Sequence, residues 1–98
     1  MKEYDNKRMI KLWLESHYPL TIVSDRYSGT YSDGDYTAWP LLFYQVPQEI
    51  EGSDTVCAEY WWSKDNDTSL VGRGETIQLA MDDLVKRMQE RYDSMEEE

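Results

Sequence analysis

The apolar positions of the C-terminal quarter repeat with a helical period. Between Thr76 and Met95 they fall three and four residues apart, which predicts an amphipathic helix with Thr76 as its N-cap. The stripe consists of Ile77, Ala80, Met81, Leu84, Val85, Met88, Tyr92 and Met95. We expect its last members, Tyr92 and Met95, to extend beyond a small sheet, where a homodimer would bury them.

A second helical pattern lies near the N-terminus. Asp5 is the predicted N-cap, and Tyr4 and Met9 are spaced as a hydrophobic staple. Pro19 should end this helix, because the residue before a proline avoids the α region. The helix should pack at a sheet edge or on a partner subunit, and its apolar face consists of Met9, Ile10, Trp13 and Leu14.

Three short segments have the composition of strands. Leu20–Ser24 is rich in β-branched residues, and an aromatic segment from Tyr36 to Tyr44 follows a turn-like loop at 28–35. The two strands should pair antiparallel, with Pro40 at a bulge or an edge, or with the second strand ending at Trp39. Ser69–Gly72 is the third predicted strand.

The segment that follows the loop at 46–52 has two readings. Either Ser53 or Asp54 caps a short helix that runs through Trp62, or the same residues form a strand, because Val, Thr, Tyr and Trp favour sheets. In both cases the adjacent Trp61 and Trp62 point in different directions, so one should be buried and the other exposed.

Together these elements predict an α+β fold: a small antiparallel sheet, a long C-terminal helix packed on one face and an extra N-terminal helix. With 98 residues, the chain is long enough for one hydrophobic core, so residues 1–98 should form a single domain. We divide it into an N-terminal helix (1–18), a sheet and helix core (19–95) and an acidic tail (96–98). The tail places negative charge at the negative end of a helix dipole and should fray.

The charge of the chain restricts the classes of partner that it can bind. The net charge is −10, and the segment 27–63 contains six acids and no Lys or Arg. Such a chain is repelled by nucleic acid and by anionic membranes and is attracted to basic proteins. We therefore expect a basic host defence or nucleic-acid-binding protein as partner, with no direct contact to nucleic acid or membrane.

Two features predict the compartment. The first twenty residues carry several charges and form no apolar signal segment, and no apolar run is long enough to span a bilayer. Cys57 is the only cysteine, so an intrachain disulfide cannot form. Both features predict a cytoplasmic protein, in the host cytoplasm if it is phage-encoded.

The segment 27–63 also supplies the candidate partner-binding residues. It is far richer in aromatic side chains than one small core requires, and exposed aromatic residues beside acids are typical of interface hot spots. The predicted anchors are Tyr27, Tyr31, Trp61 and Trp62. The predicted steering acids are Asp33, Asp35, Glu49, Glu51, Asp54 and Glu59.

An alternative site would bind a small anionic ligand, such as a nucleotide. Gly72-Arg73-Gly74-Glu75-Thr76 leads from a strand into a capped helix, whose N-terminus attracts anions, although a tight structural turn explains the same residues. The loop at 28–34 offers flexible backbone and hydroxyl groups. The alternative ligand set is Arg26, Ser28, Gly29, Thr30, Arg73 and Thr76.

No pattern of residues indicates catalysis, a cofactor or a metal. His17 is the only histidine, which is too few for a typical zinc site, and nothing in the spacing pairs it with Cys57. Asp65, Asp67 and Ser69 match the start of a calcium loop, but Leu70 and Thr76 stand where that loop requires Gly and an acid. We therefore expect a protein that is not an enzyme and has neither cofactor nor metal.

Two resemblances add to this reading. The strand-turn-strand with Tyr36-Thr37-Ala38-Trp39-Pro40, followed by Val71–Thr76, Ala80 and an amphipathic helix, resembles the HicB-type antitoxin module, which has a β-β-β-α core. The chain departs from that module by its N-terminal helix and by a long insertion between the second and third strands. The resemblance implies this fold and, as one alternative function, an antitoxin that binds a small basic toxin.

By composition, the chain is similar to small phage-encoded anti-defence proteins, including anti-CRISPR inhibitors. Such proteins place carboxylates where a basic channel would bind phosphates. This similarity implies a non-catalytic inhibitor of a basic, nucleic-acid-handling host protein that acts by nucleic-acid mimicry. Ligand sequestration and the antitoxin role remain alternatives.

Overall fold

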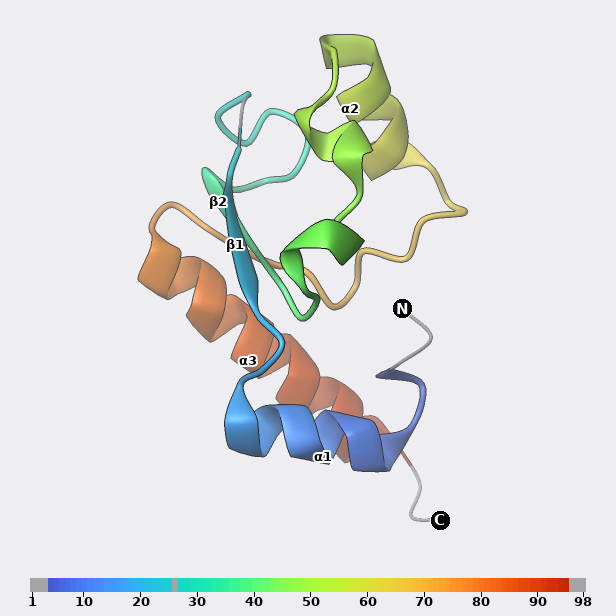
Figure 1. The fold of residues 1–98 in the computed structure, drawn as a ribbon, viewed down its shortest axis with the longest axis vertical. Helices are drawn as coiled ribbons and strands as arrows, with labels where there is room; N and C mark the ends of the chain where they lie inside the picture. The colour runs from blue at the N-terminus through green and yellow to red at the C-terminus, as the bar shows by residue number, and fades with distance from the viewer. Residues whose placement is uncertain (1–3, 26, 96–98) are drawn as a thin grey trace.

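A computed structural model describes residues 4–25 and 27–95. It confirms the predicted α+β class, with a three-stranded antiparallel sheet and a long C-terminal helix (Figure 1). The elements, in chain order, are α1 (Lys7–Ser16), β1 (Thr21–Ser24), β2 (Tyr36–Trp39), the 3-10 turns η2 (Phe43–Gln45) and η3 (Gln48–Glu51), α2 (Asp54–Trp62), β3 (Gly72–Gly74) and α3 (Ile77–Ser94).

The sheet has the order β1-β2-β3, so β1 and β3 are its two edges. Thr21 lies opposite Trp39, and Tyr36 lies opposite Gly74. Strand β2 ends at Trp39, the shorter of the two predicted limits, and Pro40 follows it without an N–H to continue the ladder. Of the rest of the predicted strand, Phe43 and Tyr44 belong to η2 instead.

Each face of the sheet has its own apolar cluster, because successive strand residues point to opposite faces. Ile22, Ala38 and Leu70 pack on the side of α3 with Ala80, Leu84 and Met88. Their chain neighbours Val23, Trp39 and Val71 point the other way, toward Ile50 of η3 and the aromatic residues of α2. The segment between β2 and β3 therefore covers the second face of the sheet.

The predicted position of the third strand is wrong. The paired residues are Gly72–Gly74, whereas Leu70 and Val71 precede the strand and are fully buried. A Cβ atom on Gly72 would lie 2.2 Å from the carbonyl oxygen of Ala80, so only glycine lets this strand approach α3 closely enough. The hydrophobic pattern correctly located the buried residues Leu70 and Val71, but it did not locate the residues that pair with β2.

The predicted cap of the first helix is also wrong. Asn6, not Asp5, is the N-cap of α1, and its side chain accepts a hydrogen bond of 2.8 Å from the N–H of Arg8. The predicted Tyr4–Met9 staple is therefore out of register, and Met9 is 43% exposed. The helix ends at Ser16. His17 follows as the C-cap in a left-handed conformation and lies two residues before Pro19.

Helix α1 packs across the C-terminal half of α3 (Figure 1). Tyr92 and Met95, which were expected to extend past the sheet, contact the cluster that contains Ile10 and Trp13 of α1. The apolar surplus that predicted a homodimer is thus covered within the chain. The predicted tail at 96–98 lies outside the described residues.

Two further helix predictions are confirmed, but the predicted apolar stripe of α3 is only partly buried. The helical reading of 54–62 is confirmed, and Ser53, one of the two candidate caps, accepts from the N–H of Val56. Helix α3 begins after Thr76, whose hydroxyl accepts from the N–H of Leu79 at 3.1 Å. Ala80, Leu84 and Met88 form its buried stripe, while Ile77 is exposed.

Candidate protein-binding surface

Helix α2 and the loop at 27–35 lie at one end of the molecule, and α1 lies at the other (Figure 1). All predicted partner-binding residues belong to this α2 end, which we define as residues 27–35 and 48–62. The fold brings them to one end because β1 and β2 run antiparallel and their connecting loop meets the segment that follows η3.

The loop at 27–35 is organised by Asp25, a residue that the sequence analysis did not select. One oxygen of its carboxylate accepts from the N–H of Tyr27 at 2.7 Å, and the other accepts from the hydroxyl of buried Ser32. Ser28 and Asp33 take left-handed backbone conformations, with φ of 52° and 69°, as does Gly29, with φ of 82°. The loop is therefore a defined turn rather than a free tip.

Three aromatic rings connect this loop to α2. Tyr27 and Tyr31 meet edge to face at 5.7 Å between ring centroids, and Tyr31 meets Trp62 in the same way at 5.3 Å. The hydroxyl of Tyr27 donates to the carbonyl of Gly52 at 2.7 Å, and that of Tyr31 donates to the carboxylate of Asp54. We call Tyr27, Tyr31 and Trp62 the aromatic ladder.

The bond to Asp54 raises the pKa of Tyr31 to about 12, with the hydrogen bond to the carboxylate as the largest cause. Tyr31 therefore remains protonated and donates throughout the physiological range. Both tyrosines of the ladder position the loop against α2, and the ladder presents Trp62 at its end.

The two adjacent tryptophans have different environments, as expected. Trp62 is 68% exposed. Trp61 is partly buried, with its ring 5.6 Å from that of Trp39 and 5.3 Å from the guanidinium of Arg73. Trp61 therefore belongs to the second apolar cluster, and Trp62 is the member of the pair that a partner can reach.

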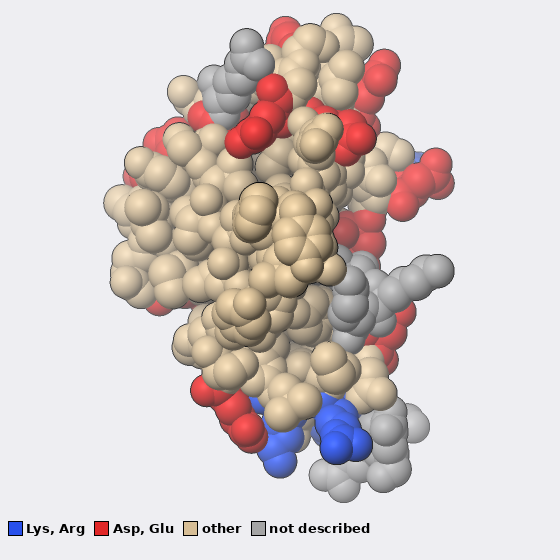
Figure 2. Space-filling model, in the orientation of Figure 1, with Lys and Arg blue, Asp and Glu red and all other residues tan. Residues whose placement is uncertain are grey.

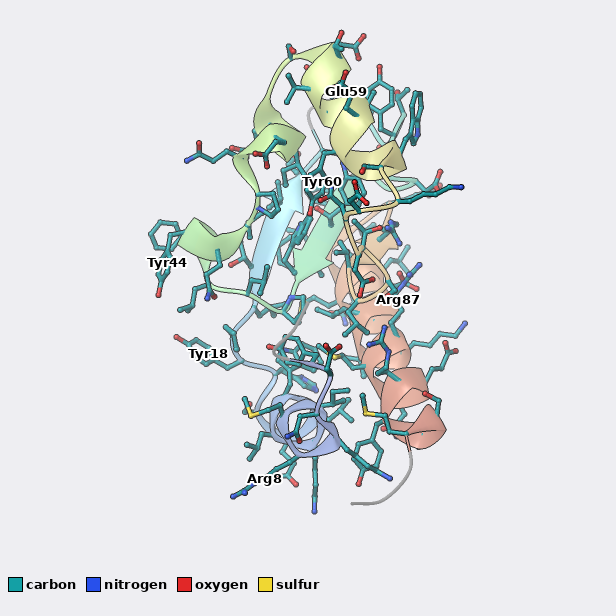
Figure 3. The ribbon with its side chains drawn as sticks, turned by 90° about the vertical axis from the view of Figure 1, so that its right-hand side faces the viewer. Arg8, Tyr18, Tyr44, Glu59, Tyr60 and Arg87 are labelled. Atoms are coloured by element: carbon teal, nitrogen blue, oxygen red, sulfur yellow. The ribbon has the colours of Figure 1, made fainter. Side chains whose placement is uncertain are left out.

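All six predicted steering acids are exposed, but they lie on different sides of the α2 end. Glu49 and Glu59 line a hollow of about 410 Å³ together with Val56 and Tyr60, and Figure 3 labels Glu59 and Tyr60. Asp33 and Asp35 border a separate hollow of about 220 Å³. Asp54 begins α2 at the ladder, and Glu51 borders a groove beside β1.

Charge is unevenly spread over the molecule. On the face that Figure 2 shows, carboxylates surround the α2 end, a wide uncharged area lies in the middle, and Lys and Arg lie at the α1 end beside further carboxylates. Helix α1 contributes Lys7, Arg8 and Lys11 as well as Glu15 to that end, and Arg8 is labelled there in Figure 3. Among the described residues of the α2 end and the turn after α2, Lys64 is the base next to this acidic surface.

The residues of the alternative ligand site have structural contacts. Arg73 is partly buried against Trp61 and donates to the carbonyl of Thr68 at 3.3 Å, while the hydroxyl of Thr76 caps α3. Burial lowers the pKa of Arg73. The loop residues Ser28 and Gly29 border the hollow of Asp33, Asp35 and Glu75, where carboxylates oppose an anionic ligand. Thr30 donates to the carbonyl of Tyr27, and Arg26 lies outside the described residues.

The residues considered for catalysis lie far apart in the fold. Cys57 is buried in α2, and burial raises the pKa of its thiol, which disfavours the nucleophilic thiolate. His17 ends α1 and stacks near Trp13, with ring centroids 5.2 Å apart. Within residues 4–25 and 27–95, no three His, Cys, Asp or Glu side chains are placed to hold a metal ion.

None of the helices in the described part of the chain combines the length and the hydropathy required to span a bilayer.

Comparison with known proteins gives no relative: no family model, curated protein or solved structure matches the chain.

One exposed feature was missed as a site. Phe43 and Tyr44 of η2 are 78% and 70% exposed and meet edge to face at 5.5 Å. In the sequence they look like the end of a strand, so their aromatic character was attributed to the sheet. The proline that precedes them by three residues was the signal that the strand had ended.

Proposed function

We propose that the chain is a non-catalytic, acidic inhibitor that binds a basic, nucleic-acid-handling protein through its α2 end. In this proposal its carboxylates occupy positions where that protein would otherwise bind phosphates, as in phage-encoded anti-defence proteins. The partner is a protein of the host that carries the phage, and the interaction takes place in the cytoplasm.

The observation that carries the proposal is the exposed Trp62 among exposed carboxylates. A tryptophan fixed by a neighbouring ring loses little side-chain entropy on binding, and such residues dominate interface energies. The ladder provides this support, because Tyr31 contacts the Trp62 ring at 5.3 Å and is itself bonded to Asp54. The surrounding acids would steer a basic partner and raise its association rate.

The distribution of charge supports the same proposal. Residues 27–35 and 48–62 of the α2 end include acids and no Lys or Arg, whereas α1 carries Lys7, Arg8 and Lys11 beside Glu15, so the α2 end attracts a basic partner more strongly than the α1 end does. Glu49 and Glu59 are exposed and line a hollow together with Val56 and Tyr60. Both carboxylates are therefore accessible to a partner.

The experiment compares three proteins as bait in a host lysate at moderate salt. The first is the wild type, the second carries Glu49→Lys, Glu51→Lys and Glu59→Lys, and the control carries Glu15→Lys, Asp82→Lys and Glu90→Lys. All six positions are exposed, and the two variants have equal net charge. We expect wild type and control to retain the same basic protein and the α2-end variant to lose it, with the unfolding midpoints of all three similar.

Trp62→Ala supplies a second comparison. We expect it to weaken binding of the captured protein by at least about thirtyfold, the range of an interface hot spot. Tyr18→Ala removes an equally exposed ring outside both the α2 end and the groove beside β1, and is the matched control. Retention of the same partner by the α2-end variant, or equal effects of the two ring deletions, would refute the proposal. Retention of a small molecule alone would indicate ligand sequestration, and a small basic toxin would indicate an antitoxin.

A further inference from the structure

A groove of about 540 Å³ runs along the free edge of the sheet. One wall is β1, which pairs with β2 on its other side only. The opposite wall consists of η2 and the residues that lead into η3, with Phe43, Tyr44 and Glu51 among them. In Figure 3, Tyr44 projects from this side of the sheet, beyond β1.

The register determines which backbone groups face the groove. The N–H of Asp25 donates to the carbonyl of Asp35 at 2.7 Å, in line with the β1–β2 register. Antiparallel pairs alternate between bonded and non-bonded, so Val23 and Thr21 also face β2. Ile22 and Ser24 alternate with them, and their N–H and carbonyl groups therefore point outward into the groove.

The edge lacks most of the devices that prevent strand addition. Natural edges are protected by an inward-pointing charge, a proline, a bulge or a covering element. Strand β1 reads Thr-Ile-Val-Ser and has neither charge nor proline, and it pairs with β2 without an offset in register. Its four residues suit a short peptide segment rather than a second full sheet.

Charge and aromatic surface indicate the occupant. Glu51 is the charged residue on the groove wall, Asp25 follows β1 at its end, and no Lys or Arg lines the groove in the described part of the chain. The exposed rings of Phe43 and Tyr44 offer faces on which a guanidinium or ammonium group can rest. A second copy of the chain would bring another net charge of −10 to the same edge, which repels it.

We propose that the β1 edge binds an extended, cationic segment of a partner protein as an additional strand. The outward groups of Ile22 and Ser24 hydrogen-bond the segment, and alternate Lys or Arg side chains lie over the η2 rings near Glu51. The groove shares Gln48 and Glu51 with the α2 end and is otherwise a different surface, and the inference does not depend on the proposed function.

The probe is an octapeptide of alternating Lys and Val, titrated into the isotopically labelled full chain. We expect it to perturb the NMR signals of Ile22 and Ser24 and to slow hydrogen exchange of both amides. The same peptide with all its backbone amides N-methylated, and its Glu–Val counterpart, test backbone pairing and charge. Neither should bind.

Two pairs of variants locate the site. Ser24→Pro removes one outward donor on an edge position where proline is tolerated, and Ser24→Ala keeps that donor. Tyr44→Ala removes a ring of the groove, and Tyr18→Ala removes an equally exposed ring outside it. We expect Ser24→Pro and Tyr44→Ala to weaken binding of the peptide about five- to tenfold. The two controls should leave its affinity unchanged.

Absence of binding at millimolar Lys–Val peptide would overturn the inference, as would equal binding of the N-methylated peptide. Concentration-dependent protection of Ile22 and Ser24 in the free protein would also overturn it, because a second copy would then cover the edge. Glu51 lines the groove, so the variant that separates the two proposals carries only Glu49→Lys and Glu59→Lys, neither of which lines it. We expect this double variant to bind the Lys–Val peptide like the wild type, so this inference and the proposed function can fail separately.

Discussion

Several side chains of this molecule act through partners far away in the sequence. Tyr31 joins the loop at 27–35 to Asp54, the first residue of α2. Tyr4 donates to the carbonyl of Pro40 at 2.7 Å and so ties the N-terminus to the end of β2. Contacts of this kind leave no local pattern, because each residue type is ordinary for a loop or a helix end.

The Tyr31–Asp54 bond has a measurable titration. Because the carboxylate stabilises the protonated phenol, Tyr31 should ionise near pH 12 instead of near 10, and Asp54→Asn should lower its pKa toward 10. The folded pKa is raised, so this contribution to stability is complete below about pH 10 and is lost as the pH rises to about 12. Ultraviolet difference titration of tyrosinate, with Tyr31→Phe to assign the signal, measures the shift. A pKa of Tyr31 near 10 would contradict the Tyr31–Asp54 hydrogen bond.

Gly72 is required by packing, not by flexibility. A Cβ atom there would lie 2.2 Å from the carbonyl oxygen of Ala80 and 2.6 Å from the backbone nitrogen of Leu84. Gly72→Ala should therefore lower the free energy of unfolding by about 1–3 kcal/mol, the usual range for overpacking. Gly52→Ala is the control, because its nearest contact would be a side-chain atom of Val56 at 3.1 Å. Equal urea midpoints for the two variants would exclude a close β3–α3 contact.

At the scale of elements, the helices were predicted well and the short strands less well. The stripe of α3 spans several turns, so its period is unambiguous, and Thr76 marks its start. Strand β3 is three residues long and consists of Gly72, Arg73 and Gly74, which have no strand signature. It is a strand because β2 pairs with it on one side and α3 packs against it on another. Neither contact can be read from the residues of β3 themselves.

The same limit applies to the candidate site. Composition located the acidic, aromatic segment, and its parts at 27–35 and 48–62, which contain the selected residues, do lie at one end of the fold. The sequence could not assign its ten residues to sides of α2, because that depends on the path of the chain through η2 and η3. Nor could it distinguish Trp61 from Trp62, because the choice depends on where Trp39 and Arg73 lie.

The beginning of α1 gives a prediction at the same scale. Asn6→Ala should lower the free energy of unfolding by about 1 kcal/mol, because the N–H of Arg8 loses its acceptor. Asp5→Ala removes an exposed acid one residue earlier and should change it much less. Urea unfolding of both variants measures the difference. A larger loss of unfolding free energy for Asp5→Ala would indicate that Asp5, not Asn6, is the N-cap.

At the scale of the whole molecule, two ends have different roles. Helix α1 covers the apolar stripe of α3, and Lys7 lies over the ring of Tyr92 at 4.6 Å from its centroid. The apolar surface that predicted a homodimer is therefore buried within one chain. The α2 end presents carboxylates and Trp62, and the proposed function belongs to it. Between them lies the free edge of β1.

The central claim is that the α2 end takes the place of nucleic acid on a basic partner. The most direct measurement is displacement: the captured partner is bound to a fluorescent nucleic acid, and the chain is titrated into the complex. We predict loss of fluorescence anisotropy at one chain per binding site, weakened by added salt, and no displacement by the variant reversed at Glu49, Glu51 and Glu59. A ternary complex, in which the partner holds the chain and the nucleic acid together, would contradict the account.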